Sequence, residues 1–186
     1  MNTLIQDMYV AFAGYATSTA IEKQYNKGNS NLEGYERLKQ RAIDEGVYTD
    51  TPFRFDNYVI GPNIEAVARA VNNFVGYYLF LDYGEINCAV DGRNIHRDRL
   101  KLAVTVAYKV KEFNADMMEQ LIVSSECLRR LAIIRDDMVR RYSCGSGDKM
   151  ISDSHTFVPF LGRELSSIGW TMMFDRQGID SFRVSY

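Results

Sequence analysis

The sequence predicts an α+β fold, in which an antiparallel sheet built on one long hairpin is packed by two or three helices. Two neighbouring segments predict the hairpin. Tyr77–Val90 is rich in aromatic and β-branched residues, and Leu100–Val110 alternates apolar and polar side chains over eleven residues. Such alternation is typical of half-buried strands, which a loop over residues 91–98 would join. Gly84 indicates a bulge, because the apolar face changes sides there.

Two helices are expected in the first third of the chain. Residues 2–16 place apolar side chains on one stripe, which predicts a short amphipathic helix that docks on a larger body. A second helix is expected over Leu32–Glu45, capped by Asn31 and ended by Gly46. Few of its side chains are apolar, so we expect it to lie on the surface with one narrow line of contact.

An extended segment and a strongly amphipathic helix follow. The prolines of Val47–Pro62 exclude a central strand, so we expect an extended or edge segment held to the domain by its aromatic side chains. Asn63 then caps a helix whose apolar residues recur at helical spacing as far as Val75. Gly76 is expected to close this helix.

A long helix is expected after the hairpin. Asn114 is its predicted cap, and Asp116 lies in the first turn, where the helix dipole favours an acidic side chain. An apolar stripe reaches Tyr142, and a break near Arg135 is compatible with the length of the helix. The pair Asp136 and Asp137 is interpreted as part of a charged solvent face, because neighbouring helical side chains point about 100° apart and chelate one ion poorly.

Two strands are predicted near the end of the sequence. A polar loop over residues 143–156 and an ambiguous segment around Phe157–Leu161 precede them. The strands are expected over Trp170–Phe174 and Ser181–Tyr186, with a turn between them. The second strand alternates, and its apolar face predicts a strand for assembly with other subunits; that face consists of Phe182, Val184 and Tyr186.

The size of the chain fits one domain with an appendage. It has 186 residues, which is enough to bury a core without a metal or disulfides. We assign residues 1–62 to an appendage of helices and extended aromatic segment, and residues 63–186 to the α+β core domain. We find no secretory signal and no apolar segment near the length of a membrane span, so no contact with a membrane is expected.

The charge is nearly balanced, with 22 basic and 24 acidic residues. This balance argues against a dedicated nucleic-acid-binding protein, which usually carries a basic excess. Two local basic patches are nevertheless present, and in a ring of many copies they would face DNA phosphates or neighbouring subunits. They consist of Arg93, Arg97, Arg99 and Lys101 near the hairpin loop, and of Arg129, Arg130, Arg140 and Arg141 on the long helix.

No motif predicts catalysis, a cofactor or a metal site. The three cysteines are widely spaced, and the two histidines, His96 and His155, are not accompanied by further ligands at metal-binding spacing. The triplet that begins at His96 lacks the asparagine and the glycine-rich loop of protein kinases. We therefore do not expect an enzyme.

In the order of its elements, the chain resembles the tail-terminator and head–tail connector proteins of tailed bacteriophages. The resemblance rests on the helix capped by Asn63, the hairpin Tyr77–Val110, the helix from Asn114 and the strand beginning at Gly169–Trp170. It implies a small α+β subunit of a homo-oligomeric ring in the virion neck or tail, assembled in the host cytoplasm. Its partners would be other neck or tail proteins, with non-specific contact to DNA.

Two other classes of function stay open at this point. One is a small cytosolic ligand-binding domain or enzyme with a pocket between the sheet and the long helix. That pocket would be lined by Tyr77, Tyr83, Tyr108 and Trp170. The other is a regulatory or inhibitory binding module.

Overall fold

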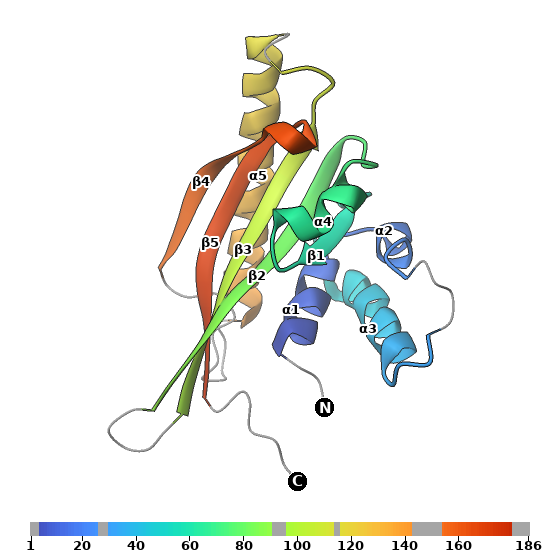
Figure 1. The fold of residues 1–186 in the computed structure, drawn as a ribbon, viewed down its shortest axis with the longest axis vertical. Coiled ribbons are helices and arrows are strands. Elements are labelled where there is room, and N and C mark those ends of the chain that lie inside the picture. The colour runs from blue at the N-terminus through green and yellow to red at the C-terminus, as the bar shows by residue number, and fades with distance from the viewer. Residues whose placement is uncertain (1–3, 26–29, 91–95, 114–115, 143–153, 180–186) are drawn as a thin grey trace.

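The computed structural model describes residues 4–25, 30–90, 96–113, 116–142 and 154–179 (Figure 1). Its elements are α1 (Leu4–Ala13), α2 (Ser18–Glu22), α3 (Tyr35–Tyr48), β1 (Tyr58–Gly61), α4 (Ile64–Val71), β2 (Tyr77–Val90), β3 (His96–Lys109), α5 (Met117–Tyr142), β4 (His155–Gly162), a 3-10 turn (Arg163–Leu165) and β5 (Ser167–Ile179).

The five strands form one sheet in the order β1-β2-β3-β5-β4. The predicted α+β fold and the long hairpin are confirmed, and β2 has the expected bounds. The register shifts between Tyr83 and Ile86, which confirms the bulge predicted at Gly84. The sheet is mixed rather than wholly antiparallel, because the extended segment before Asn63 contributes β1 as a parallel edge strand beside β2.

The alternation of the strands divides the side chains between two faces of the sheet. One face carries the even-numbered residues of β3 from Leu100 to Val106, which pack with α1 and α5 in the larger core. On the opposite face, Tyr78 and Phe80 pack against α4 in a smaller core. The domain therefore has a helical layer on each side of the sheet, as the ribbon in Figure 1 shows.

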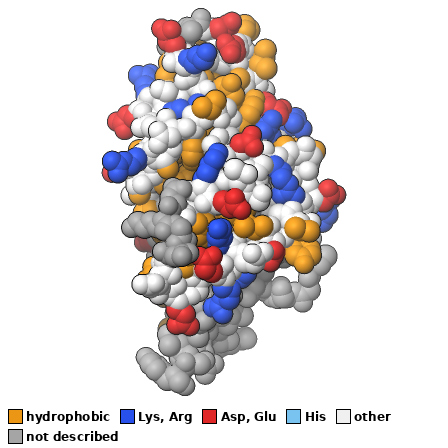
Figure 2. All heavy atoms as spheres, turned by 90° about the vertical axis from the view of Figure 1, so that its right-hand side faces the viewer, with side chains coloured by type: hydrophobic (Ala, Val, Ile, Leu, Met, Phe, Trp, Pro, Cys, Tyr) orange, Lys and Arg blue, Asp and Glu red, His pale blue; other side chains and the backbone are white. Residues whose placement is uncertain are grey.

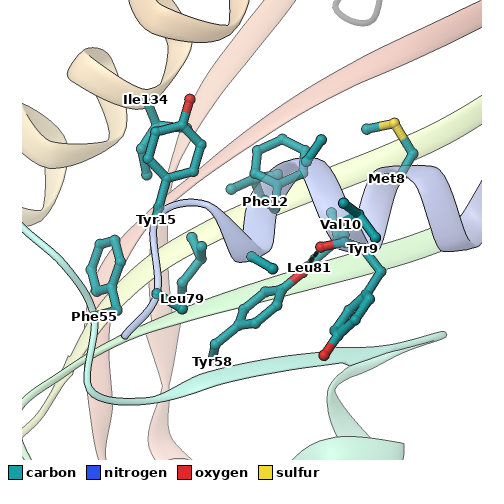
Figure 3. Close-up of a cluster of buried hydrophobic side chains, with 14 of the residues drawn as sticks. Met8, Tyr9, Val10, Phe12, Tyr15, Phe55, Tyr58, Leu79, Leu81 and Ile134 are labelled. Carbon is teal, nitrogen blue, oxygen red and sulfur yellow. Dashed lines mark hydrogen bonds between the residues drawn. The ribbon is translucent and has the colours of Figure 1, made fainter. Parts of the chain in front are cut away.

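The first helix is part of the larger core. Met8 and Phe12 of α1 are fully buried, and they share this core with Leu79 and Leu81 of β2 and Ile134 of α5 (Figure 3). The expected docking of this helix thus takes place within the subunit, which leaves its apolar stripe covered. The division into an appendage, residues 1–62, and a core domain, residues 63–186, stays a prediction. Described side chains of both parts belong to one core.

The second predicted helix is displaced along the chain. The helix α3 begins after Gly34, whose φ of 84° is favourable only for glycine, so the expected cap at Asn31 is wrong. It then continues through Gly46 to Tyr48, because the guanidinium of Arg54 donates to the Gly46 carbonyl oxygen at 2.6 Å and holds this last turn in place. Its single buried residue among those described is Ala42, as expected for a surface helix.

The helix α4 begins where it was predicted and ends earlier. The side chain of Asn63 accepts a hydrogen bond from the Ala66 N–H at 2.8 Å, which confirms the cap. The helix ends at Val71 rather than Val75. The N–H groups of Asn73 and Phe74 bond to carbonyl oxygens three residues earlier in tighter turns, and Gly76, with a φ of 74°, then leads into β2. The apolar pattern of the sequence continues beyond the end of the helix, because Phe74 packs in the smaller core although it is not helical.

The long helix α5 is continuous from Met117 to Tyr142, without a break near Arg135. Its predicted cap, Asn114, lies outside the described residues. The carboxylate of Asp116 accepts hydrogen bonds from the backbone N–H groups of Met118 and Glu119 at 2.8 and 3.0 Å. Asp116 therefore satisfies two of the amides that a helix leaves without partners in its first turn.

The turn expected over residues 175–180 is wrong for residues 175–179, which continue β5. This strand pairs with β3 along its whole length, from Lys109 opposite Ser167 to Arg97 opposite Ile179. The first residues of β3 supply backbone partners for residues 175–179 and keep them extended. The local sequence pattern of residues 175–179 does not reveal this pairing. The ambiguous segment Phe157–Leu161 belongs to β4, the second edge of the sheet.

Candidate functional site

The helix α5 buries one stripe along its length. Cys127, Leu131, Ile134 and Met138 recur at three- and four-residue spacing, and all are fully buried against the sheet. Because successive residues of a helix are about 100° apart, these four side chains cover one side of α5. This stripe accounts for the attachment of α5 to its own sheet.

The opposite side of α5 is also apolar, but only in its first turns. Met118, Leu121 and Ile122 are 63%, 58% and 69% exposed, and they lie about 180° around the helix from the buried stripe. Met117 precedes them and is exposed as well. We call these four residues the α5 apolar face. Figure 2 shows hydrophobic side chains on the upper end of the molecule, where α5 begins.

A second exposed feature lies at the other end of the molecule. There β2, β3 and β5 extend beyond the helices as a narrow three-stranded arm (Figure 1). We define this β-arm as residues 87–90, 96–99 and 177–179, which are paired in continuous register. The β2 side chains of the arm, from Asn87 to Val90, are all exposed. No helix among the described residues is drawn across this arm in Figure 1.

The basic residues predicted on α5 all have acidic partners. Arg129 and Arg130 both contact Glu126 at 2.7 Å, Arg140 contacts Asp137 at 3.0 Å, and Arg141 contacts Glu45 at 2.8 Å. These contacts reduce the charge that the helix presents to a polyanion. Contact of this patch with DNA or with a neighbouring subunit stays a prediction.

The basic patch near the hairpin loop is described in part. Arg99 faces Asp175 at 3.5 Å, and Lys101 contacts Glu85 at 2.7 Å. Arg97 belongs to β3 by its backbone, and nothing is described of its side chain. Arg93 and the predicted assembly residues lie outside the described residues; those assembly residues are Phe182, Val184 and Tyr186.

A buried polar network joins the N-terminal helices to α5. The Tyr15 hydroxyl donates to Asp137 at 2.6 Å and receives a hydrogen bond from Arg141 at 3.0 Å. Arg141 also contacts Asp137 at 2.9 Å and Glu45 of α3 at 2.8 Å. Burial, together with the hydrogen bond to the Asp137 carboxylate, raises the pKa of Tyr15 well above its ordinary value.

The interpretation of Asp137 as a solvent-facing residue is therefore wrong. The side chain is 6% exposed, whereas that of the adjacent Asp136 is 67% exposed. The difference follows from the helical position of Asp137 beside the buried stripe and opposite Tyr15. The spacing of Asp137 and Arg141 by four residues is the signal in the sequence that indicates an ion pair on one side of a helix.

Three of the aromatic residues expected to line a ligand pocket between the sheet and α5 make contacts in this region. The Arg130 guanidinium lies 3.9 Å from the Tyr77 ring centroid, and that ring packs edge-on against Tyr108. The Trp170 indole donates to Ser124 at 3.0 Å. Tyr108 also borders a cavity of about 720 Å³ between the end of β3 and the first turns of α5.

Other candidate chemistry is sparse in the described part of the chain. No group of three or more His, Cys, Asp and Glu side chains is placed to hold a metal ion among the described residues. Burial raises the pKa of the Cys127 thiol to about 12, so this thiol is protonated at neutral pH. Within the same residues, no helix combines the length and apolar character that crossing a membrane requires.

No protein-family model matches the chain, and no curated protein matches its sequence.

Proposed function

We propose that this chain is a structural subunit that assembles with further copies of itself into a ring. The observation that carries the proposal is the α5 apolar face, in which Met118, Leu121 and Ile122 lie on the side of the helix away from its own sheet and Met117 lies beside them. A helix that is apolar on both sides is usually buried on both sides. The fold of the single subunit covers only one of them.

The energetics favour a covered state of this face. Burial of one large apolar side chain contributes about 1.5–3 kcal/mol, so the four residues of the face represent several kcal/mol in an assembly. Single exposed apolar residues are common on protein surfaces, but a contiguous group on one helix marks an interaction site more often.

The β-arm suggests how neighbouring subunits are arranged. It projects from the end of the sheet opposite to the α5 apolar face (Figure 1). Two exposed regions at opposite ends of one subunit suit a head-to-tail contact, and such contacts close into rings when the rotation between subunits allows it. A narrow arm also gains stability from a neighbour, because a few strands without cover are marginally stable.

The biological setting that we propose is the neck or tail end of a tailed phage. The order of elements resembles tail-terminator and head–tail connector proteins, and a ring with a central channel suits both roles. In this setting the subunit contacts other neck or tail proteins. Any contact with DNA is non-specific and weak for each subunit, because the described arginines of α5 already contact carboxylates.

The ring is tested by measuring the mass of the purified chain by light scattering and by imaging it in negative stain. We expect a closed ring of many copies at micromolar concentration in at least one salt condition. Leu121→Glu should shift the protein to the monomer, because it places a charge in the contact. The matched control is Val139→Glu, on the same side of the helix near its other end, which should leave the ring intact. A wild-type chain that is monomeric in every condition contradicts the proposal.

A further inference from the structure

The free edge of β1 lies at the bottom of a groove between two helices. The cavity at this place measures about 520 Å³. Residues 57–60 form one side of it. Ala20 of α2 and the following Lys23 and Gln24 form a second side, and Ala70 of α4 and the following Asn73 and Phe74 form a third. The side of the molecule that carries α2 and α3 faces the viewer in Figure 2.

Among the described residues β1 pairs with a strand on one side only, so its other side directs backbone groups into this groove. In a parallel pair, alternate residues direct their N–H and C=O groups toward the neighbouring strand. The Asn57 carbonyl oxygen accepts from the Leu79 N–H of β2 at 3.0 Å, so Tyr58 and Ile60 direct their backbone groups away from β2. These outward groups are the pattern that an additional strand recognises.

We propose that residues 181–186 of a second copy of this chain bind in this groove as a strand added to β1. This inference rests on the proposed assembly of the subunit and names the segment that one copy offers to the next. Phe182, Val184 and Tyr186 share one side of an extended chain, and Ser181, Arg183 and Ser185 share the other. The groove has matching character, with Ala20, Ala70 and Phe74 as apolar walls and polar side chains around them.

One of these polar side chains is poised for a partner. The Gln24 amide nitrogen is buried, and it has no hydrogen-bond partner among the described residues. Burying an amide without a partner is unfavourable, and the carbonyl groups or serine hydroxyls of an added strand would satisfy it.

The strand that fills the groove must come from another copy, because residues 181–186 cannot reach the groove of their own chain. Leu79, which pairs with β1, lies opposite Val106 of β3, and Val106 lies opposite Trp170 of β5. Trp170 precedes Ile179, the last described residue of β5, by nine residues. Nine residues of strand span about 30 Å, and the seven residues from 180 to 186 reach at most about 25 Å when fully extended. The lateral separation of β5 and β1 increases the gap further.

The opposite edge of the sheet is a poorer acceptor. The edge strand β4 carries Pro159 at its centre, opposite Trp170. Proline has no N–H to offer to an incoming strand, and prolines at sheet edges commonly block such pairing. The described part of β1 carries no proline, and helices on both sides of its groove would hold an added strand.

A disulfide between copies tests this contact directly. Ala70→Cys in one copy and Val184→Cys in another are co-expressed in a chain with Cys88→Ser and Cys144→Ser, while the buried Cys127 is retained. We expect a covalent dimer under mild oxidation only when both variants are present. Replacing Ala70→Cys by Thr156→Cys on β4 gives the matched control. A covalent dimer with Thr156→Cys and none with Ala70→Cys overturns the proposal.

A second measurement separates this inference from the ring itself. Ala70→Arg fills the groove with an exposed side chain, and Ala66→Arg places the same charge one turn earlier on α4, outside the groove. We expect Ala70→Arg to weaken self-association at least tenfold and Ala66→Arg to leave it unchanged. If the ring persists with Ala70→Arg and no disulfide forms, the strand contact is wrong while the proposed assembly survives. A wild-type chain without any self-association overturns both.

Discussion

The two ends of α5 differ in their surroundings, although they belong to one unbroken helix. From Cys127 onward, the large side chains facing the sheet are buried, and the described arginines have acidic partners. In the first turns, the apolar side chains on the opposite side of the helix are exposed to solvent. The later part of α5 therefore stabilises the fold of the subunit through its buried side chains. The first turns leave apolar side chains exposed, where another molecule can contact them.

The largest effect is expected at the buried network of the later part. Asp137→Ala removes the carboxylate that Tyr15 and Arg141 both contact, and it leaves buried polar groups without that partner. Loss of one member of a buried ion pair costs about 3–5 kcal/mol of the free energy of unfolding. Urea denaturation of the monomer measures it. The matched control Asp136→Ala, at an exposed carboxylate, should change the free energy of unfolding by less than about 0.5 kcal/mol. Equal losses of stability in the two variants would contradict the assigned role of Asp137.

The next effect compares two leucines of α5 directly. Leu131→Ala empties a fully buried position and should cost about 2–5 kcal/mol. Leu121→Ala removes an exposed side chain, so we expect a change below about 0.5 kcal/mol in the monomer together with weaker self-association. Thermal or chemical unfolding under conditions where the chain is monomeric measures the first quantity, and light scattering the second. If Leu121→Ala destabilised the monomer as much as Leu131→Ala, the proposed division of α5 would be wrong.

The smallest effect concerns the pairing of Glu126 with Arg129 and Arg130. Their hydrogen bonds, that of Arg129 above all, lower the pKa of Glu126 to about 2 from an ordinary value near 4.5. The stabilisation is therefore present above about pH 4.5 and is lost as the pH falls toward 2. Because the pair is partly exposed, Glu126→Gln should cost less than about 1 kcal/mol at neutral pH. Urea midpoints at several pH values should show this difference shrinking in acid, and a difference that grows there would contradict the assigned sign.

The elements that could be predicted from the sequence are those whose pattern is local and strong. The alternation of Leu100–Val110 requires no information from elsewhere in the chain, and neither does the capping of α4 by Asn63. The extension of β5 through residues 175–179 was missed, because it depends on pairing with β3, more than seventy residues earlier in the sequence. The edge position of β1 was expected from the prolines around it, but its parallel pairing with β2 depends on residues outside the segment.

The sequence identifies the basic residues of the candidate site, but it does not predict which side chains they contact. The basic residues of α5 were recognised, but their partners are set by tertiary packing, as the contact of Arg141 with Glu45 shows. The sequence predicts one apolar stripe that reaches Tyr142, and this stripe does not distinguish Met118–Ile122 from the residues that pack on the sheet. Helical periodicity alone does not say where the sheet ends, so it could not separate covered turns from exposed ones.

The hydrogen bond between Tyr15 and Asp137 has a consequence for synthesis on the ribosome. Its two residues are 122 positions apart in the sequence, and α1 packs against strands and a helix that all follow it. The apolar side of α1 therefore stays without its partners while most of the chain is being made. Closing such a long loop makes this one of the later steps of folding. Until α5 has been synthesised, this apolar surface is exposed in the nascent chain, and exposed surface of this kind promotes aggregation.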